Sequence, residues 1–211
     1  FGGALRAAAA YADRVRAVAE ANPVAFVDRA LFAQVAAAAA RLARFVGSSP
    51  RDLVLVPNAT TGINAVVKSV LGAGAASGAT GGEGAPARVL CLDVGYASVH
   101  KLLREQAARH GLELVVVDTP RPPVLNEDGV AEAVERALAS EGPPWALAVV
   151  DWVTSNTALK LPIARIAEAC RRNGAPLLVD AAHALGPIAM DLGALGAEEE
   201  ATSKDEGPRQ R

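Results

Sequence analysis

Residues 88–117 read RVLCLDVGYASVHKLLREQAARHGLELVVV, and this stretch decides the fold class. It begins with an apolar run at 88–92, continues with a helical pattern at 97–110, and ends with a second apolar run at 112–117. Short unbroken apolar runs separated by a helix are typical of parallel strands that helices cover on both faces. The stretch therefore predicts a strand–helix–strand unit of an α/β domain.

The same alternation extends in both directions along the chain. Downstream, it predicts helices and strands in turn at 129–140, 146–150, 162–173 and 176–180. Upstream, the apolar run at 53–57 predicts a further short strand, followed by a helix to about residue 71 and a Gly/Ala-rich loop at 72–87. We therefore expect a three-layer α/β fold with a mostly parallel sheet.

The two ends of the chain differ from this middle part. Two helices are expected at 5–21 and 26–46, because Asn22-Pro23 interrupts the first pattern and Gly47 follows the second. The last 14 residues carry almost no apolar side chain, which predicts a disordered acidic tail. The expected organisation is an N-terminal helical arm (1–50), an incomplete large domain (51–197) and the tail (198–211).

Composition excludes several classes of protein. The 211 residues are 51% hydrophobic and 21% charged with a formal net charge of -2, which argues against a nucleic-acid-binding protein. We find no apolar run of the ~18–20 residues that a membrane span needs and no secretory signal, and we expect a cytoplasmic protein. Cys91 and Cys170 lie far apart in apolar contexts, so we interpret them as buried side chains, and we expect no metal site.

Polar residues follow four of the expected strands, where ligands bind in open α/β sheets. The segment 58–64, NATTGIN, opens a helix, and its backbone N–H groups and threonines suit a phosphate. Its alternative interpretation is an ordinary helix cap. Tyr96 follows the strand at 88–92 and could stack on a flat ring, although a tyrosine at a helix start is more often packing.

The other two strand ends are DWVTSNT at 151–157 and LLVDAAH at 177–183. The first can be a solvated turn. An aspartate that closes a buried strand, as Asp180 does, must be hydrogen-bonded or charge-paired. Asp180 could cap a helix or hold a protonated heterocyclic nitrogen, and His183 could face the same cleft or be a core imidazole.

Taken in order, these segments resemble the class V aminotransferase family of enzymes that depend on pyridoxal phosphate (PLP), in the branch of isopenicillin N epimerase-like and cysteine desulfurase-like proteins. The resemblance covers about residues 1–197 and is carried by 58–62, 93–99, 153–157 with Pro162, and 177–183 continuing through 185–196. It implies the large domain of a fold-type-I PLP transferase, an amino acid or amine as substrate, and a homodimer when the chain is full length.

The resemblance also implies a role for each matching residue. Ala59 and Thr60 would hold the cofactor phosphate with help from Thr61, and Tyr96 would stack on the pyridine ring. Ser155 would lie near the ring hydroxyl with Asn156 beside it, Asp180 would pair with the ring nitrogen, and His183 would contact the ring oxygen or the substrate side. No catalytic residue is assigned, because the family's cofactor-attaching lysine has no clear counterpart among Lys68, Lys101, Lys160 and Lys204.

Three interpretations of the function stay open. The chain can be a fragment of a transaminase, an epimerase or a carbon–sulfur lyase or desulfurase, inactive in this form for want of that lysine. It can be a non-catalytic product that binds PLP weakly or pairs with a full-length partner. It can also be an unrelated α/β binding module whose polar strand ends are caps and turns.

Overall fold

The computed structural model describes residues 3–77, 86–120 and 126–195, which belong to two compact units. One unit is Val56–Ala189, and the other combines Phe1–Leu55 with Met190–Arg211. The expected boundaries after residues 50 and 197 stay predictions, and the expected tail at 198–211 lies outside the described residues.

A four-stranded parallel sheet forms the centre of the first unit. Its strands are β1 (Arg88–Leu92), β2 (Glu113–Val117), β3 (Trp145–Asp151) and β4 (Leu177–Asp180), in the order β2-β1-β3-β4. Every neighbouring pair is parallel, and β1, which lies between β2 and β3, is buried along its whole length. The α/β fold with a parallel sheet is confirmed.

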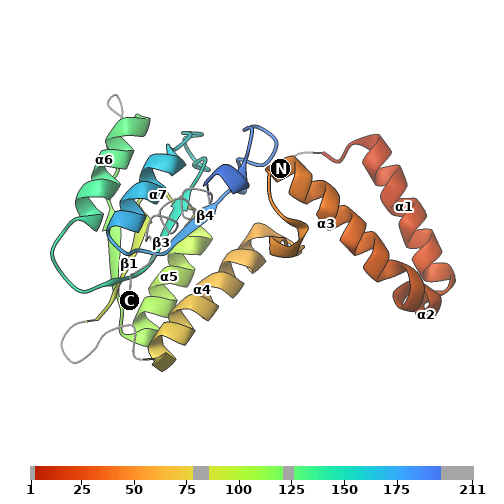
Figure 1. The fold of residues 1–211 in the computed structure, drawn as a ribbon, viewed down its shortest axis with the longest axis horizontal. Helices are drawn as coiled ribbons and strands as arrows, with labels where there is room; N and C mark the ends of the chain where they lie inside the picture. The colour runs from red at the N-terminus through yellow and green to blue at the C-terminus, as the bar shows by residue number, and fades with distance from the viewer. Residues whose placement is uncertain (1–2, 78–85, 121–125, 196–211) are drawn as a thin grey trace, which may run out of the picture. The chain divides into compact units, whose positions relative to one another are not determined.

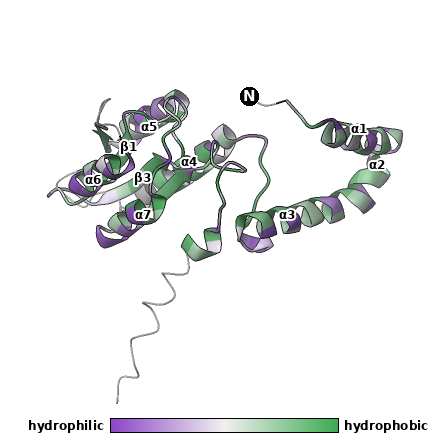
Figure 2. Ribbon diagram, turned by 90° about the horizontal axis from the view of Figure 1, so that it is seen from above, coloured by the Kyte–Doolittle hydropathy of each residue, from purple (hydrophilic) through white to green (hydrophobic). Residues whose placement is uncertain are grey.

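Helices cover both faces of this sheet (Figure 1). Helices α4 (Ala59–Ser77) and α5 (Ala97–His110) lie on one face, and α6 (Glu127–Leu138) and α7 (Ile163–Arg172) lie on the other. The core under α4 and α5 is aliphatic and includes Val67, Leu71, Val89, Leu103 and Val149. Figure 2 shows the apolar β3 between helices that turn polar faces outward.

Local sequence signals set where these helices begin and end. Asn126 accepts a hydrogen bond from the backbone N–H of Gly129 at 2.7 Å and so caps the start of α6. Gly111 ends α5 in the left-handed conformation, with φ 64°, which a glycine adopts without a steric penalty. These two residues therefore set the start of α6 and the end of α5.

Two expectations about residues 53–87 are wrong. The apolar run at 53–57 is no strand, because no neighbouring strand pairs with it in the described residues, and Val54 is 81% exposed. The loop expected from residue 72 begins later, because α4 continues to Ser77 through alanines and glycines that do not interrupt it. Residues 78–85 of that loop lie outside the described residues.

The second unit is built mainly of helices. These are α1 (Arg6–Ala21), α2 (Pro23–Ala25), the π-helix η1 (Phe26–Leu31), α3 (Phe32–Val46) and the short 3-10 helix η2 (Pro50–Asp52). Gly193 donates a backbone hydrogen bond to Gly47 and so joins the segment after residue 190 to the end of α3. The two helices expected in this region are therefore present, the second with a π-helical first part.

One continuous helical stretch, Pro23–Val46, is long and apolar enough to cross a membrane by length and composition, with a mean hydropathy of 1.3. This differs from the expectation that no run reaches that length, because the alanines of α3 raise the mean hydropathy. It is weak evidence for a membrane span, since helices of other kinds pass the same test.

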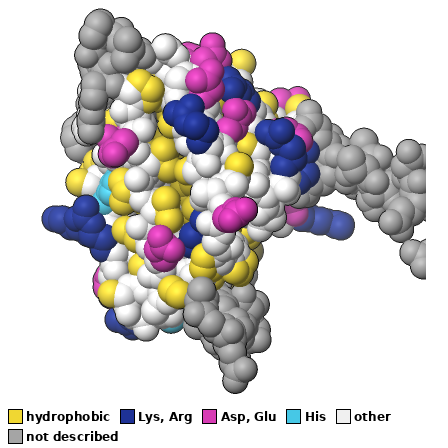
Figure 3. All heavy atoms as spheres, turned by 90° about the vertical axis from the view of Figure 1, so that its left-hand side faces the viewer, with side chains coloured by type: hydrophobic (Ala, Val, Ile, Leu, Met, Phe, Trp, Pro, Cys, Tyr) yellow, Lys and Arg dark blue, Asp and Glu magenta, His cyan; other side chains and the backbone are white. Residues whose placement is uncertain are grey.

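On the face in Figure 3, basic and acidic side chains are intermingled, which agrees with the small net charge.

Candidate functional site

The parallel sheet brings the ends of its four strands to one edge. Three loops that carry expected site residues leave from this edge, after β1, β3 and β4. The fourth expected group, at 58–61, lies at the start of α4, which packs beside α5 and against β3. All four groups belong to the same compact unit.

Asn58 organises the start of α4. Its Oδ1 accepts hydrogen bonds from the backbone N–H of Thr61 at 2.8 Å and from the Thr61 hydroxyl at 3.0 Å, so the interpretation as a helix cap is correct. In the described part of the chain, the N–H groups of Ala59 and Thr60 and the Thr60 hydroxyl have no acceptor. These exposed donors at a helix start can bind an anion such as a phosphate.

Tyr96 lies at the start of α5, in the loop that follows β1. Its backbone oxygen accepts from the N–H groups of Val99 and His100, and its side chain is 44% exposed. Beneath it, Gly95 is so close to His100 that a Cβ at Gly95 would lie 3.0 Å from the imidazole Nε2. The tight turn therefore presents the Tyr96 ring outward, where it could stack on a ligand.

The starts of α4 and α5 meet in a small crevice. Thr60, Ile63 and Asn64 line it from α4, and Ser98, Val99 and Leu102 line it from α5. The structure thus packs Thr60 of the expected phosphate group beside Ser98, two residues after Tyr96. The Ser98 hydroxyl is buried there without a hydrogen-bond partner in the described residues, and so is the His100 Nε2 beside Gly95.

Two aspartates close β3 and β4 side by side. Asp151 and Asp180 are register partners across the two strands, and they are 6% and 8% exposed. Asp180 Oδ1 accepts a hydrogen bond from the N–H of Ala182 at 3.0 Å. Burial, and next to it the negative charge of Asp180, raise the pKa of Asp151 to about 7. No ion pair joins either carboxyl group to a cation within the described ranges.

Ser155 and His183 lie in the loops that leave these two aspartates. The loop after β3 is held by Thr154, whose Oγ1 accepts from the N–H of Leu159 at 2.9 Å. Ser155, in the same loop, is half-buried, while His183 is exposed after β4. Neither side chain makes a hydrogen bond to another described residue.

Sequence reasoning underestimated Asp151 and did not consider His100. The sequence suggests that Asp151 is the first residue of a polar loop, whereas β3 includes it and buries it. The available signal was its position, because it ends an apolar strand in the same way as Asp180 does. For His100, nothing in the sequence signals that its imidazole lies 3.9 Å from the Cys91 sulfur.

Both cysteines agree with the interpretation as buried side chains. Cys91 and Cys170 are free and buried, and burial raises the pKa of each thiol to about 11. For Cys91, Arg104 acts in the opposite direction, while Asp151 and Asp93 add to the increase of its pKa. A thiol that stays protonated is a poor nucleophile.

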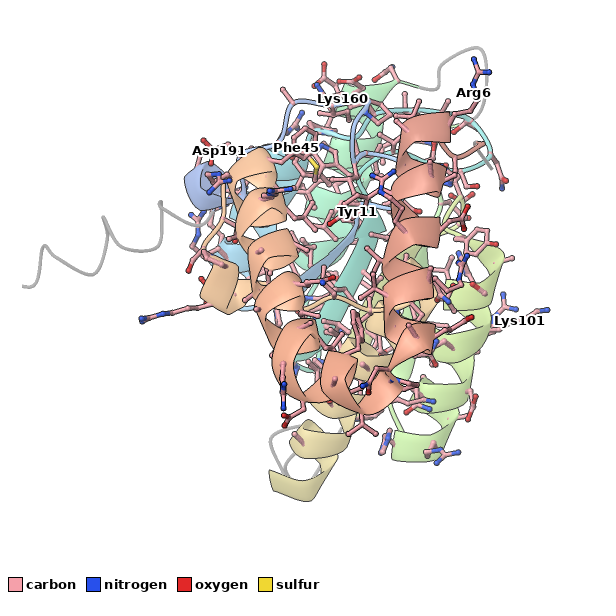
Figure 4. The ribbon with its side chains drawn as sticks, turned by 90° about the vertical axis from the view of Figure 1, so that its right-hand side faces the viewer. Arg6, Tyr11, Phe45, Lys101, Lys160 and Asp191 are labelled. Carbon is pink, nitrogen blue, oxygen red and sulfur yellow. The ribbon has the colours of Figure 1, made fainter. Side chains whose placement is uncertain are left out.

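The lysines in the described residues are Lys68 on α4, Lys101 on α5 and Lys160 in a bridge with Val153. All three are exposed, and Figure 4 shows Lys101 extending from the outer face of α5. Lys204 lies outside the described residues. None of the three therefore lies among the buried groups of the sheet edge.

A profile of the family described as "Aminotransferase class-V" matches residues 8–203 of this chain. Among the similar proteins, isopenicillin N epimerase of Amycolatopsis lactamdurans is 38% identical over 86% of this chain and 42% of its own length. Cysteine desulfurase IscS of Dechloromonas aromatica is 29% identical over 77% of this chain and 36% of its own length. The chain thus spans less than half the length of these relatives.

Solved structures share the fold. A variant of the protein C-DES, described as having glycine linked covalently to its PLP cofactor, superimposes with a TM-score of 0.67 at 22% identity. The match covers 87% of this chain and 45% of that one. At this identity the likeness supports the three-layer fold alone, and it agrees with the sequence-based expectation.

Proposed function

Because the chain belongs to the aminotransferase class-V family, we propose that it forms the cofactor-binding part of a PLP-dependent enzyme. The observation that carries the proposal is the pair of buried carboxyl groups, Asp151 and Asp180, which face no described cation at the sheet edge. A buried carboxylate needs a positive partner, and a protonated ring nitrogen is one. The C-DES structure, whose fold this chain shares, is described with a PLP cofactor.

The residues present fit this cofactor at both of its ends. The free N–H groups of Ala59 and Thr60, with the Thr60 hydroxyl, would bind the phosphate. Thr61 would assist indirectly, because its backbone N–H and its hydroxyl both donate to Asn58 and so hold the start of α4 in place. Asp180 would accept a hydrogen bond from the ring nitrogen and so keep that nitrogen protonated.

The remaining residues would hold the ring flat and face the substrate. Tyr96 would stack on one face of the ring, Ser155 would lie near the ring hydroxyl, and His183 would contact the ring oxygen or the substrate side. When bound, PLP supplies a ring that accepts electrons from the α-carbon of an amino acid. The substrate would therefore be a small amino acid or amine, and the reaction a transamination, an epimerisation or a carbon–sulfur cleavage.

A second candidate is a chain that binds PLP without turning over a substrate. It is favoured by the exposed positions of Lys68, Lys101 and Lys160, away from the buried groups that would hold the ring. Borohydride reduction after PLP is added, followed by peptide mapping, separates the two candidates. An adduct on a single lysine supports the enzyme, whereas scattered adducts or none support the non-catalytic alternative, which can also pair with a full-length partner. The homodimer and the cytoplasmic location stay predictions.

The test of the cofactor site is a PLP titration followed by absorbance. We expect the 211-residue chain to bind PLP and Asp180→Asn to lose most of the affinity. Asp118→Asn is the matched control, because Asp118 also follows a strand of the sheet but is exposed. Equal affinity of the wild type and Asp180→Asn would contradict the proposed role of Asp180.

A further inference from the structure

Strand register places the carboxyl groups of Asp151 and Asp180 on one face of the sheet. Paired residues of neighbouring strands lie about 4.8 Å apart and project to the same side. Leu147 and Val149 of β3 and Leu178 of β4 pack into the core under α4 and α5. Because side chains alternate along a strand, Asp151 and Asp180 project toward that same layer.

Around this pair, one other acidic group, Asp93, and one basic group, Arg104, lie near Cys91. The titratable groups here are Cys91 in β1, Asp93 directly after β1, and His100 and Arg104 in α5. The first turns of α4 contribute the polar Thr60 and Asn64 but no charge. Arg104 acts on Cys91, and no described cation pairs with Asp151. Two carboxylates at this separation, both more than nine-tenths buried, repel each other strongly.

We propose that Asp151 is a positioning residue, which holds a proton beside the charged Asp180 and releases that proton when a cationic ring nitrogen binds to Asp180. This inference rests on the proposed function. The bond that breaks is the O–H bond of the Asp151 carboxyl group, and its proton passes to the solvent. The carboxylate that remains adds a second negative charge beside the bound cation, which strengthens its binding through Asp180.

The release of the Asp151 proton on binding determines how the affinity for the cation changes with pH. The pKa of Asp151 is about 7 in the free chain, and a cation on Asp180 lowers it, because it offsets the repulsion between the two carboxylates. Binding then releases protons in the range below neutrality, so the affinity for the cation increases with pH up to about 7 and levels off above it. A neutral amide at position 151 removes this contribution.

The first measurement needs no cofactor. Carboxyl ¹³C resonances of the 211-residue chain, labelled at aspartate, are followed against pH in the wild type, Asp180→Asn and Asp118→Asn. We expect an Asp151 midpoint near 7 in the wild type and the control, and a lower midpoint in Asp180→Asn. An Asp151 midpoint that is the same in all three proteins overturns the proposal, because the two carboxyl groups are then uncoupled.

The second measurement is a PLP titration at about pH 5.5 and about pH 8, with wild type, Asp151→Asn and Asp118→Asn. PLP itself titrates in this range, so the ratio of each variant's Kd to the wild-type Kd is compared. We expect the Asp151→Asn ratio to be close to one at the lower pH and to increase several-fold at the higher pH, while the Asp118→Asn ratio stays constant.

The outcomes separate this inference from the proposed function. If Asp180→Asn loses PLP affinity while the Asp151→Asn ratio does not change with pH, the cofactor site stands and the role of Asp151 is wrong. If Asp180→Asn binds PLP like the wild type, the proposed cofactor site itself fails. A merely structural role of Asp151 would weaken binding equally at both pH values, which also overturns the inference.

Discussion

Arg88, the first residue of β1, carries a stabilising contact that can be tested quantitatively. Its guanidinium donates to the Pro143 carbonyl at 2.8 Å, to the Ser140 hydroxyl at 2.8 Å and to the Ser140 carbonyl at 3.1 Å. It also lies 4.0 Å from the ring centroid of Trp145. Arg88 is 7% exposed, so these contacts fix the loop between α6 and β3 against the start of β1.

The expected cost of Arg88→Met follows from these contacts. A hydrogen bond from a charged group contributes about 1.5–3 kcal/mol, and a cation–π contact contributes about 1 kcal/mol. Ser140 is exposed, so water replaces part of the loss there. We therefore expect the free energy of unfolding to decrease by about 2–4 kcal/mol, measured by urea denaturation.

Arg109→Met is the control for this measurement. Arg109 makes a single ion pair with Glu105 at 3.1 Å and is 64% exposed, so its loss should cost about 0.5 kcal/mol or less. Equal effects of Arg88→Met and Arg109→Met would refute the reasoning. A second check uses Gly142, where a Cβ would lie 3.1 Å from the Arg88 guanidinium carbon. Gly142→Ala should therefore destabilise Arg88→Met less than it destabilises the wild type.

Three further predictions follow from the site. Asn58→Ala should lower the free energy of unfolding by about 1 kcal/mol through loss of the α4 cap, whereas the exposed Asn156→Ala should leave it unchanged in the same urea experiment. Cys91 and Cys170 should react with a disulfide reagent at mildly alkaline pH only after unfolding, because both are buried with pKa values of about 11; rapid reaction of the folded chain would contradict this. The pKa of Asp151 is higher in the folded chain than in the unfolded chain, so its contribution to the free energy of unfolding should be greatest below about pH 4. That contribution should decrease by up to about 4 kcal/mol as the pH rises to 7. Asp151→Asn should show no such decrease relative to the wild type, and parallel pH profiles of the two proteins would be inconsistent with the buried pair.

The regular part of the fold could be predicted from the sequence almost to the residue. The strand at 88–92 and the helix at 97–110 lie where the apolar run and the helical pattern place them. Both have sharp limits, because Asp93 stops the apolar run and Gly111 stops the helix. In such places the local preference and the tertiary environment require the same structure.

The wrong predictions concern segments whose structure depends on residues that are distant in the sequence. An apolar run such as 53–57 becomes a strand only if another strand pairs with it, and this cannot be read from the run itself. The continuation of α4 to Ser77 likewise shows that scattered glycines weaken a helix without ending it. Asp151 was underestimated because its burial depends on its pairing with Asp180 across two strands.

The contacts of the proposed site residues likewise depend on how distant segments pack together. Asp180 could be singled out from its place at the end of a strand, and the crevice joining Thr60 to Ser98 depends on how α4 packs on α5. The family resemblance predicts that these segments lie together. Their individual roles stay predictions, because geometry alone does not assign a ligand.

Amide chemical-shift mapping with PLP tests most directly whether the separate loops bind one cofactor. We predict that adding PLP to the ¹⁵N-labelled chain shifts the resonances of Ala59, Thr60, Tyr96, Ser155 and Ala182 together, with one shared dissociation constant. Shifts that are confined to a single loop, or that titrate with unrelated constants, would contradict a common site at the carboxyl edge of the sheet.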